Sequence, residues 1–372
     1  MTPSPLQLKI AFAAISGMNL TLGRELLRLT GSEAEFFAMS ETRLRYLTQS
    51  RARIYSADYR AQVLRRAADE EIFVGSNAVR PVYFTDDDYP RRLLECEDAP
   101  LMLYAAGGLD DLNACHTVGI VGTRHATPYG RDWTERLVAD LHERVGNTVI
   151  VSGLAYGIDI AAHRAALHAG APTVAVMATG MQTIYPADHR ADARDIVRSG
   201  GMLLTEYGHS EPIHKGNFVA RNRIVAGLCD CVVVAESAEK GGALITANLA
   251  AGYNRDVFAL PGRIADTYSA GCNALIAANV AALVSGADDI ARAMGWPLTA
   301  DAAADGAPCL PIELNPDEAL IVDFLEQTDD ASLAQLTAAT GFAVSKLMSL
   351  LIDMEFRSLV LSMPGGRYRL SR

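Results

Sequence analysis

The sequence predicts an α/β protein whose doubly wound parallel sheet is preceded by a small helical domain and followed by a winged helix. Three observations support this prediction. In the middle of the chain, short runs rich in Val, Ile and Leu alternate with helix-like segments, as in parallel sheets covered by helices on both faces. The first block, up to about Asn77, has apolar residues at helical spacing. The last block has three helical segments and then a hairpin pattern.

Composition predicts a soluble globular protein. The chain has 372 residues, of which 50% are hydrophobic and 21% charged, which is enough for a large core and more than one domain. Six cysteines without a C-x-x-C pair make no dense disulfide framework. We find neither a secretory signal pattern at the start nor an uninterrupted apolar stretch of about 18 residues. We therefore expect a cytoplasmic protein without a membrane partner.

Charge is unevenly distributed and indicates domain boundaries. The net charge is −11, although residues 1–80 hold 11 basic and 8 acidic residues, so a nucleic-acid site must be a local basic patch. No Lys or Arg occurs from Ala293 to Ser345, and an acidic, Ala-rich stretch within that gap is typical of a linker. The predicted parts are a helical domain at residues 1–78, an α/β domain at 79–296, a linker at 297–312 and a winged helix at 313–372.

The N-terminal block leaves two interpretations open. Ser16-Gly17-Met18 and the following Thr21 to Arg24 are compatible with the turn of a helix-turn-helix or helix-hairpin-helix, which can offer backbone N–H groups to a phosphate. A small helical packing domain with solvated arginines fits the same residues.

The middle block supplies the predicted sheet. Its strands are expected at Thr117–Val121, Thr148–Ser152, Thr173–Met177, Met202–Thr205, Cys231–Ala235 and Asp256–Leu260. Its helices are expected at Pro128–Arg144, Ile158–Ala169, Ala187–Ser199, Asn217–Gly227 and Ala243–Tyr253. Thr127 before Pro128 is typical of a helix start, and Gly170 and Gly200 are typical of helix ends.

The last block is acidic. Its helices are expected at Asp317–Gln327, Ser332–Thr340 and Ser345–Phe356, before a hairpin turn at Pro364-Gly365-Gly366. The third helix of a typical winged helix reads DNA. Residues 313–372 hold 5 basic and 9 acidic residues, so we expect this domain to dock a protein and not to grip DNA unaided.

The loops that leave the strands are where doubly wound sheets bind ligands. After the first strand, Gly122-Thr123-Arg124 leads to Thr127 and a helix N-terminus. Close backbone approach, hydroxyls, free N–H groups and a planar cation together suit a phosphate. The glycines lack G-x-G-x-x-G spacing, so a phosphate contact and a plain strand–helix turn both remain open.

A second glycine-flanked loop, Ser152 to Gly157, follows the next strand. It is no nucleophile elbow, because Ile150 stands where that motif needs Gly. Asp159 and His163, four residues apart on the following helix, are either an acid–base pair or a helix N-terminal carboxylate with a structural histidine.

The densest polar cluster follows the fourth strand and is typical of single-stranded nucleic-acid sites. Lys215, Arg221 and Arg223 supply cations for phosphates, Asn222 an amide, and Phe218 a ring for base stacking. Because Arg221 and Arg223 lie about 200° apart on a helix, we expect one to face the ligand and the other to brace the fold or a neighbouring loop.

A further glycine pair, Gly241-Gly242 after Lys240, opens another predicted helix and indicates either an anion site or close packing. The sequence has no H-E-x-x-H motif and no G-K dipeptide, so we expect neither a metal site nor a P-loop. We expect no cofactor.

These motifs together resemble the DprA/Smf (DNA-processing) family. The ordered set runs over about residues 80–290: Ile120-Val-Gly-Thr-Arg124, Ser152-Gly-Leu-Ala-Tyr-Gly-Ile-Asp159, Ala178-Thr-Gly180 with Tyr185-Pro186, Phe218 to Gly227, Gly242 to Ala247, and Gly271-Cys-Asn273. The resemblance implies an extended Rossmann-like domain that binds single-stranded DNA. It also implies a sterile-alpha-motif-like N-terminal domain and a C-terminal winged helix.

The function that the resemblance implies is not catalysis. Family members bind incoming single-stranded DNA in natural transformation, protect it and load the RecA recombinase, typically as homodimers through the Rossmann-like domain. The DNA-binding residues expected here are Gly122, Thr123, Arg124, Thr127, Ser152, Gly153, Tyr156, Lys215, Phe218, Arg221, Asn222, Arg223 and Lys240. Family members often carry a cation where Tyr156 stands, and the Tyr156 ring can instead stack on a base.

Two other functions make different predictions. A phosphoribohydrolase of the lysine-decarboxylase-like type has a related core, but Lys240 to Thr246 lacks the Pro, the third Gly and the catalytic Glu of its P-G-G-x-G-T-x-x-E loop. A transcription factor acting through the winged helix is disfavoured by that domain's acidity. Release of free base from a nucleotide would support the first, and preference for a duplex sequence the second.

Overall fold

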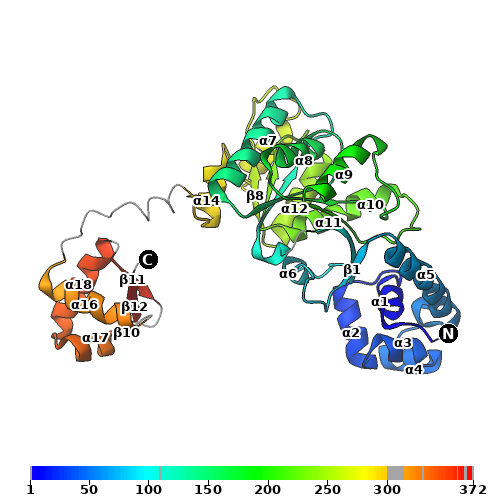
Figure 1. The fold of residues 1–372 in the computed structure, drawn as a ribbon, viewed down its shortest axis with the longest axis horizontal. Coiled ribbons are helices and arrows are strands. Elements are labelled where there is room, and N and C mark those ends of the chain that lie inside the picture. The colour runs from blue at the N-terminus through cyan, green and yellow to red at the C-terminus, as the bar shows by residue number, and fades with distance from the viewer. Residues whose placement is uncertain are drawn as a thin grey trace. The chain divides into compact units, whose positions relative to one another are not determined.

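The computed structural model describes residues 2–108, 111–299, 314–328, 331–357, 359–363 and 367–370. The chain divides into two compact units, Met1–Ala302 and Ala303–Arg372 (Figure 1). Most of the predicted linker and the predicted turn at residues 364–366 lie outside the described residues. The domain boundaries at residues 78 and 296 stay predictions.

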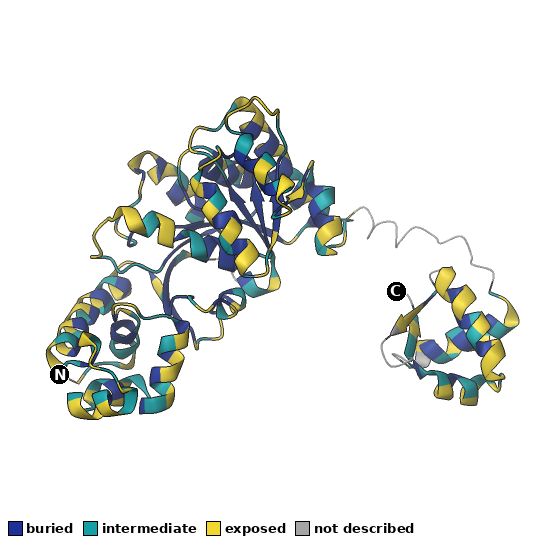
Figure 2. Ribbon diagram, turned by 180° about the vertical axis from the view of Figure 1, so that it is seen from behind, coloured by how far each residue is buried: buried dark blue, intermediate teal, exposed yellow. Residues whose placement is uncertain are grey.

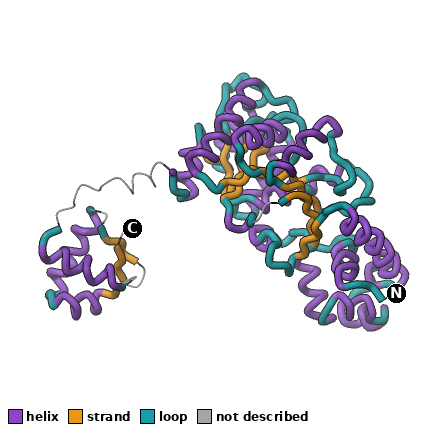
Figure 3. Tube along the Cα trace, viewed as in Figure 1, coloured by secondary structure: helices purple, strands orange, loops and turns teal. Residues whose placement is uncertain are grey.

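A nine-stranded sheet forms the centre of the described part of the first unit, in the order β1-β2-β6-β5-β4-β3-β7-β8-β9. Figure 3 shows strands in orange, with helices around them in purple. Its strands are β1 (Arg80–Tyr83), β2 (Met102–Gly107), β3 (His116–Val121), β4 (Thr148–Ser152), β5 (Thr173–Val176), β6 (Met202–Thr205), β7 (Cys231–Val234), β8 (Asp256–Ala259) and β9 (Ala282–Leu283). Every pair of neighbouring strands within the set β3 to β9 is parallel. The doubly wound parallel sheet predicted from the sequence is confirmed.

Strands β1 and β2 extend this sheet in the antiparallel sense and were missed by the sequence analysis. Strand β2 pairs with β6, and β1 pairs with β2. Strand β1 contains Pro81, which lacks a backbone donor and is tolerated because β1 lies at the sheet edge. Strand β9 has only two residues, too few to show a pattern.

Helices cover both faces of the sheet. They are α6 (Arg91–Leu94), α7 (Pro128–Asp140), α8 (Ile158–Ala169), α9 (Arg190–Arg198), α10 (Lys215–Ala220), α11 (Asn222–Leu228), α12 (Gly242–Gly252), α13 (Ala270–Ala277) and α14 (Ala287–Met294). Alternate residues of a strand enter opposite cores: Val233 packs with α7, α8 and α14, whereas Val232 and Val234 pack with α11 and α12. Burial on both faces explains the continuous apolar runs of these strands, which Figure 2 shows in dark blue.

Most predicted helix signals are confirmed. Thr127 caps α7, where its hydroxyl accepts from Gly130 N–H at 3.3 Å, and Gly170 ends α8 in the left-handed conformation. Two predicted helices are interrupted. A 3-10 turn at Ala187–His189 precedes α9, and the predicted helix Asn217–Gly227 breaks at Arg221, whose side chain turns into the sheet.

Helices α1 to α5 gather at one end of the first unit beside β1 (Figure 1). They are α1 (Pro5–Ala13), α2 (Leu20–Thr30), α3 (Glu33–Ala38), α4 (Glu41–Thr48) and α5 (Ala57–Ser76). The rings of Phe12 and Phe36 meet edge to face at 5.2 Å. The buried core around them is continuous with the one under Leu101 and Val151 of the sheet region, so these helices and the sheet share one hydrophobic core.

The second unit contains helices and strands in the predicted order. They are α16 (Pro316–Gln327), β10 (Ala331–Ser332), α17 (Leu333–Thr340), α18 (Val344–Phe356), β11 (Val360–Met363) and β12 (Arg367–Leu370). The strands form an antiparallel sheet in the order β10-β12-β11. Lys346 and Arg357, the basic residues at α18, pair with Asp317 and Glu318 of α16 at 2.6 and 2.8 Å. The winged-helix assignment stays a prediction.

Among the described residues, no single helix is both long and apolar enough to cross a bilayer. By length and composition alone, the bent pair α17 and α18, at 109° to each other, passes the same criterion together.

The sheet core predicts a stability difference. Ile120 is fully buried in β3 between α7 and α8, so Ile120→Ala is expected to lower the free energy of unfolding by about 2–5 kcal/mol through lost burial and a residual cavity. Ile264→Ala, at a side chain that is 97% exposed, is expected to change it by less than about 0.5 kcal/mol. Urea unfolding of both variants tests this, and equal losses would contradict it.

Candidate functional site

The candidate site lies where the strand order reverses, beside the carboxyl ends of β3 and β7. From β3 the chain continues to β4, β5 and β6 on one side of the sheet, whereas β7 and β8 lie on the other. Doubly wound sheets bind ligands at such a reversal because the two diverging connections leave a crevice. Here a crevice of about 250 Å³ opens between the loop after β3, the α10–α11 segment and the start of α12.

Six predicted residues come together in this crevice. They are Gly122, Thr123, Arg124, Phe218, Arg221 and Asn222. The N-terminus of α12 joins them with Gly241, Gly242 and Thr246. A second, adjoining hollow shares Arg124, Phe218 and Arg221 and adds Gly153, Tyr156 and Tyr185.

Arg221 braces the floor of both hollows. It is 4% exposed, and its guanidinium donates to the carbonyl oxygens of Gly153 and Val176, each at 2.5 Å. These carbonyls follow β4 and end β5, so one side chain ties α10 and α11 to two strands. A Cβ at Gly153 would collide with this guanidinium, which explains the glycine. Burial lowers the pKa of Arg221 and raises that of the neighbouring Asp159.

Arg223 and Ser152 point into the fold and do not line the crevice. Arg223 pairs with Glu206 at 2.5 Å, and both side chains are less than one-fifth exposed. Burial raises the pKa of Glu206. The fully buried Ser152 hydroxyl donates to the Ile120 carbonyl at 2.6 Å. Both residues brace the structure around the crevice.

A carboxylate occupies the N-terminus of α7, where the sequence analysis placed phosphate-binding N–H groups. Glu236, just after β7, accepts from the Thr127 N–H at 2.8 Å and from its hydroxyl at 2.5 Å. The Glu236 carbonyl also accepts from Thr123 N–H at 2.7 Å. Glu236 is not among the site residues predicted from the sequence. Its signal is an acidic residue directly after a buried apolar strand, which is costly unless the carboxylate is hydrogen-bonded.

Three cations lie on the segments that form the crevice: Arg124 lines it, Lys215 begins α10 three residues before the lining residue Phe218, and Lys240 directly precedes the lining residue Gly241. Arg124, Lys215 and Lys240 are exposed, and within the described ranges no carboxylate lies in ion-pair contact with any of them. The start of α12 adds backbone N–H groups, because its N-cap Gly241 has no capping side chain. Lys240 and these N–H groups lie at the start of α12, whereas Arg124 lies on the loop that leads to α7 and Lys215 lies at the start of α10.

Aromatic rings border the second hollow. The rings of Tyr185 and Phe218 meet edge to face at 5.1 Å, and Tyr185 is 50% exposed. Tyr156 is 44% exposed and donates from its hydroxyl to Asp188 at 2.8 Å. In the sequence, Tyr185 is noted only as part of a family motif and is not among the predicted DNA-binding residues. An aromatic residue at the end of a loop that leaves a predicted strand is the signal that could have singled it out.

Asp159 and His163 favour the structural interpretation. His163 is fully buried, and its Nδ1 lies 2.7 Å from the Thr173 hydroxyl. Asp159 is also buried, and the charge of the neighbouring Arg221 guanidinium opposes the rise that burial causes in its pKa. No group of three or more His, Cys, Asp or Glu in the described part of the chain is arranged to hold a metal ion.

The fold and crevice define a doubly wound α/β protein whose switch point carries a crevice lined by Arg124, a helix N-terminus and aromatic rings. The family model for DNA recombination-mediator protein A matches residues 80–295. This chain therefore belongs to that family. Over 207 residues it is 43% identical to DNA processing protein DprA of Streptococcus pneumoniae, covering 56% of this chain and 72% of the relative.

Two solved structures are similar to this chain. The X-ray structure of DprA from Streptococcus pneumoniae matches with a TM-score of 0.64 and 33% identity, over 76% of this chain and 96% of that one. A structure of DNA processing protein A from Helicobacter pylori, described for its single-stranded DNA binding mode, matches with a TM-score of 0.52 and 30% identity. That match covers 58% of this chain and 95% of the other.

Buried His163 predicts acid lability. Burial lowers its pKa from 6.5 to about 3, so below pH 6.5 the unfolded chain gains a proton that the folded chain does not. This site therefore costs up to about 1.4 kcal/mol of stability per pH unit as the pH falls from 6.5 towards 3. His163→Gln is expected to reduce that dependence in urea unfolding at pH 7, 6 and 5. Exposed His168→Gln should behave like the parent, and equal pH slopes for all three proteins would contradict the prediction.

Proposed function

We propose that this protein binds single-stranded DNA in the crevice at the switch point, without regard to sequence. The observation that carries the proposal is the meeting of two hollows at Arg124 and Phe218: one is also lined by the start of α12, the other by the exposed rings of Tyr156 and Tyr185. Adjacent phosphate-binding and base-stacking surfaces are what a single strand requires. A duplex keeps its bases stacked inside and cannot use the rings.

We expect different residues to contact the phosphates and the bases of the DNA. Phosphates lie against Arg124, Lys215, Lys240 and the start of α12, and bases lie against Phe218, Tyr185 and Tyr156. Arg221, Arg223 and Ser152 act indirectly by holding these loops. The Glu236 carboxylate repels phosphate from the first turn of α7, so the Arg124 side chain and not the α7 N–H groups takes a phosphate on this loop.

We propose that binding serves recombination and not catalysis. The protein would protect incoming single-stranded DNA in natural transformation and load the RecA recombinase in the cytoplasm, as a homodimer through the Rossmann-like domain. Family membership supports this role. Asp159 is buried beside Arg221, and the fully buried His163 ring lies against the Thr173 hydroxyl, which favours a structural role for this pair over acid–base catalysis. Stimulation of RecA filament formation on coated single strands tests the role, and steady release of free base from a nucleotide would overturn it.

We propose that the C-terminal unit docks a protein. The basic residues Lys346 and Arg357 at α18 are engaged by carboxylates of α16, which weakens any DNA grip. Removal of residues 313–372 is expected to leave oligonucleotide affinity unchanged.

Loss of a crevice cation should change affinity and salt dependence together. Arg124→Ala and Lys215→Ala are each expected to weaken binding to a labelled poly-dT oligomer. Each should also reduce the slope of log K against log salt by about 0.7, because one fewer phosphate is neutralised. Fluorescence anisotropy across a salt series measures both quantities. Arg136→Ala, at an exposed position on α7 outside the crevice, is the control, and parental binding by both crevice variants would refute the site.

Loss of a stacking ring should change affinity alone. Phe218→Ala and Tyr185→Ala are each expected to weaken poly-dT binding by about 1–3 kcal/mol, with the salt slope unchanged because no cation is lost. Tyr46→Ala removes an exposed ring from α4 and should bind like the parent. A lowered salt slope, or no loss of affinity, would speak against base stacking at these rings.

A further inference from the structure

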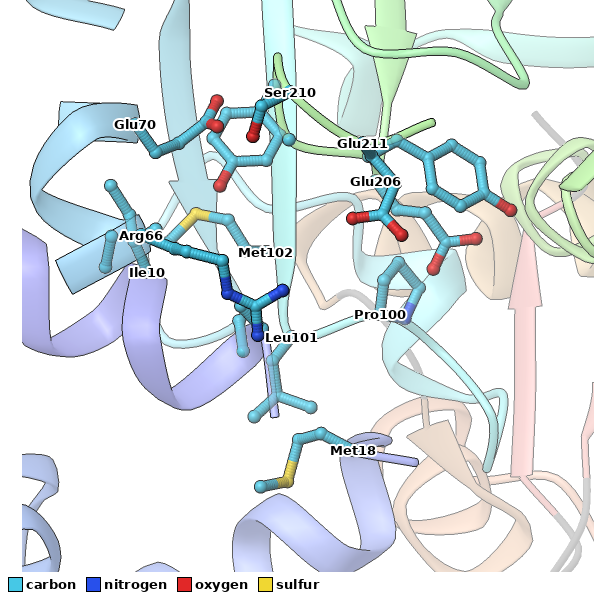
Figure 4. Close-up of a pocket in the computed structure, with 16 residues that line it drawn as sticks. Ile10, Met18, Arg66, Glu70, Pro100, Leu101, Met102, Glu206, Ser210 and Glu211 are labelled. Carbon is cyan, nitrogen blue, oxygen red and sulfur yellow. The ribbon is translucent and has the colours of Figure 1, made fainter. Parts of the chain in front are cut away.

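A cavity lies between the N-terminal helices and the loop that precedes α10, and both parts line it. It has a volume of about 160 Å³. Figure 4 shows Arg66 and Glu70 lining it from α5, and Ser210 and Glu211 from the loop after β6. This loop, residues 206–214, leads directly into Lys215 and Phe218. The N-terminal helices therefore contact the segment that carries two proposed DNA-binding residues.

One buried carboxylate holds this loop at the cavity wall. Glu70 is 6% exposed and accepts from the His209 backbone N–H at 2.8 and 3.0 Å. The same carboxylate lies 2.7 Å from His209 Nδ1. The Phe73 ring, one turn further along α5, stacks on the His209 imidazole at 4.4 Å with 9° between the planes. These contacts clamp both the backbone and the side chain of His209.

The loop of residues 206–214 also packs against the loop after β5, which carries Tyr185. A Cβ at Gly180 would collide with the Gly208 carbonyl oxygen, so the two loops touch backbone to backbone. The Gly180 loop continues to Tyr185, whose ring meets Phe218. On the other side, the Tyr207 hydroxyl donates to the Asn217 carbonyl of α10 at 3.4 Å. A displacement of residues 206–214 would therefore move Phe218 and Tyr185 relative to each other.

We propose that Glu70 of the N-terminal helices is a positioning residue for single-stranded DNA, acting through His209 on the loop that sets Lys215, Phe218 and Tyr185. The inference rests on the proposed DNA-binding function of these three residues. It gives the N-terminal helices a part in the site although none of their residues lines the crevice.

The test compares Glu70→Ala and Glu70→Gln with the parent in the full-length chain. Glu70→Ala is expected to raise the Kd for labelled poly-dT about tenfold with an unchanged salt slope, since no phosphate contact is lost. It should also speed amide hydrogen exchange of residues 206–214 in the free protein. Glu70→Gln keeps an oxygen for the His209 N–H and is expected to stay within about threefold of the parent. If Glu70→Ala speeds amide hydrogen exchange of residues 206–214 but leaves the Kd for poly-dT unchanged, the proposal is overturned.

Glu71→Ala is the matched control. Glu71 is the next residue of α5 and accepts from the Ser4 hydroxyl at 2.5 Å, so its loss breaks a bond within the N-terminal helices without touching the loop. Its Kd and exchange rates should equal those of the parent. If Glu71→Ala loses as much affinity as Glu70→Ala, Glu70 only stabilises these helices and the proposal is overturned.

Two further variants separate the possible failures. If Lys215→Ala and Phe218→Ala bind like the parent, the proposed DNA site fails, whereas the exchange rates still report on the clamp alone. If Glu70→Ala does not fold, His209→Phe replaces it: the ring still stacks on Phe73, but the bond to Glu70 from Nδ1 is lost. A Kd about threefold higher is expected, and an unchanged Kd would overturn the proposal.

Discussion

The site depends on one buried guanidinium. Arg221 lies inside the protein and donates to two backbone carbonyls at the ends of neighbouring strands, beside the buried Asp159. A buried cation is costly unless its donors are used. The segment from α10 to α11 can therefore take one position against the sheet, and the rings and cations that it carries are placed with it.

Charge is arranged to confine an anion within an acidic protein. The net charge of −11 repels polyanions from the general surface, which favours a site where uncompensated cations gather. Glu236 closes the N-terminus of α7, while the start of α12 carries no capping side chain. The two helix N-termini thus differ: α7 is capped by Thr127 and covered by a carboxylate from the loop after β7, whereas α12 begins at a glycine without a capping side chain.

The N-terminal helices and the C-terminal unit contribute in different ways. The former share a hydrophobic core with the sheet, and their Glu70 holds the loop that leads to α10. The basic residues Lys346 and Arg357 of the latter are engaged by carboxylates of their own unit. An acidic domain of this kind suits contact with a protein better than contact with a nucleic acid.

The sequence by itself determined the parallel sheet, most helix ends and the loops that form the crevice. Apolar runs, caps and glycines are local signals, so they can be recognised in the sequence without the structure. Only the tertiary structure decided the partners of Arg221, Arg223, Ser152 and Glu236, because each bond joins residues far apart in the chain. The contacts of Tyr185 with Phe218 and of Glu70 with His209 could not be predicted for the same reason: the sequence around a ring or a carboxylate does not indicate which distant loop it will meet.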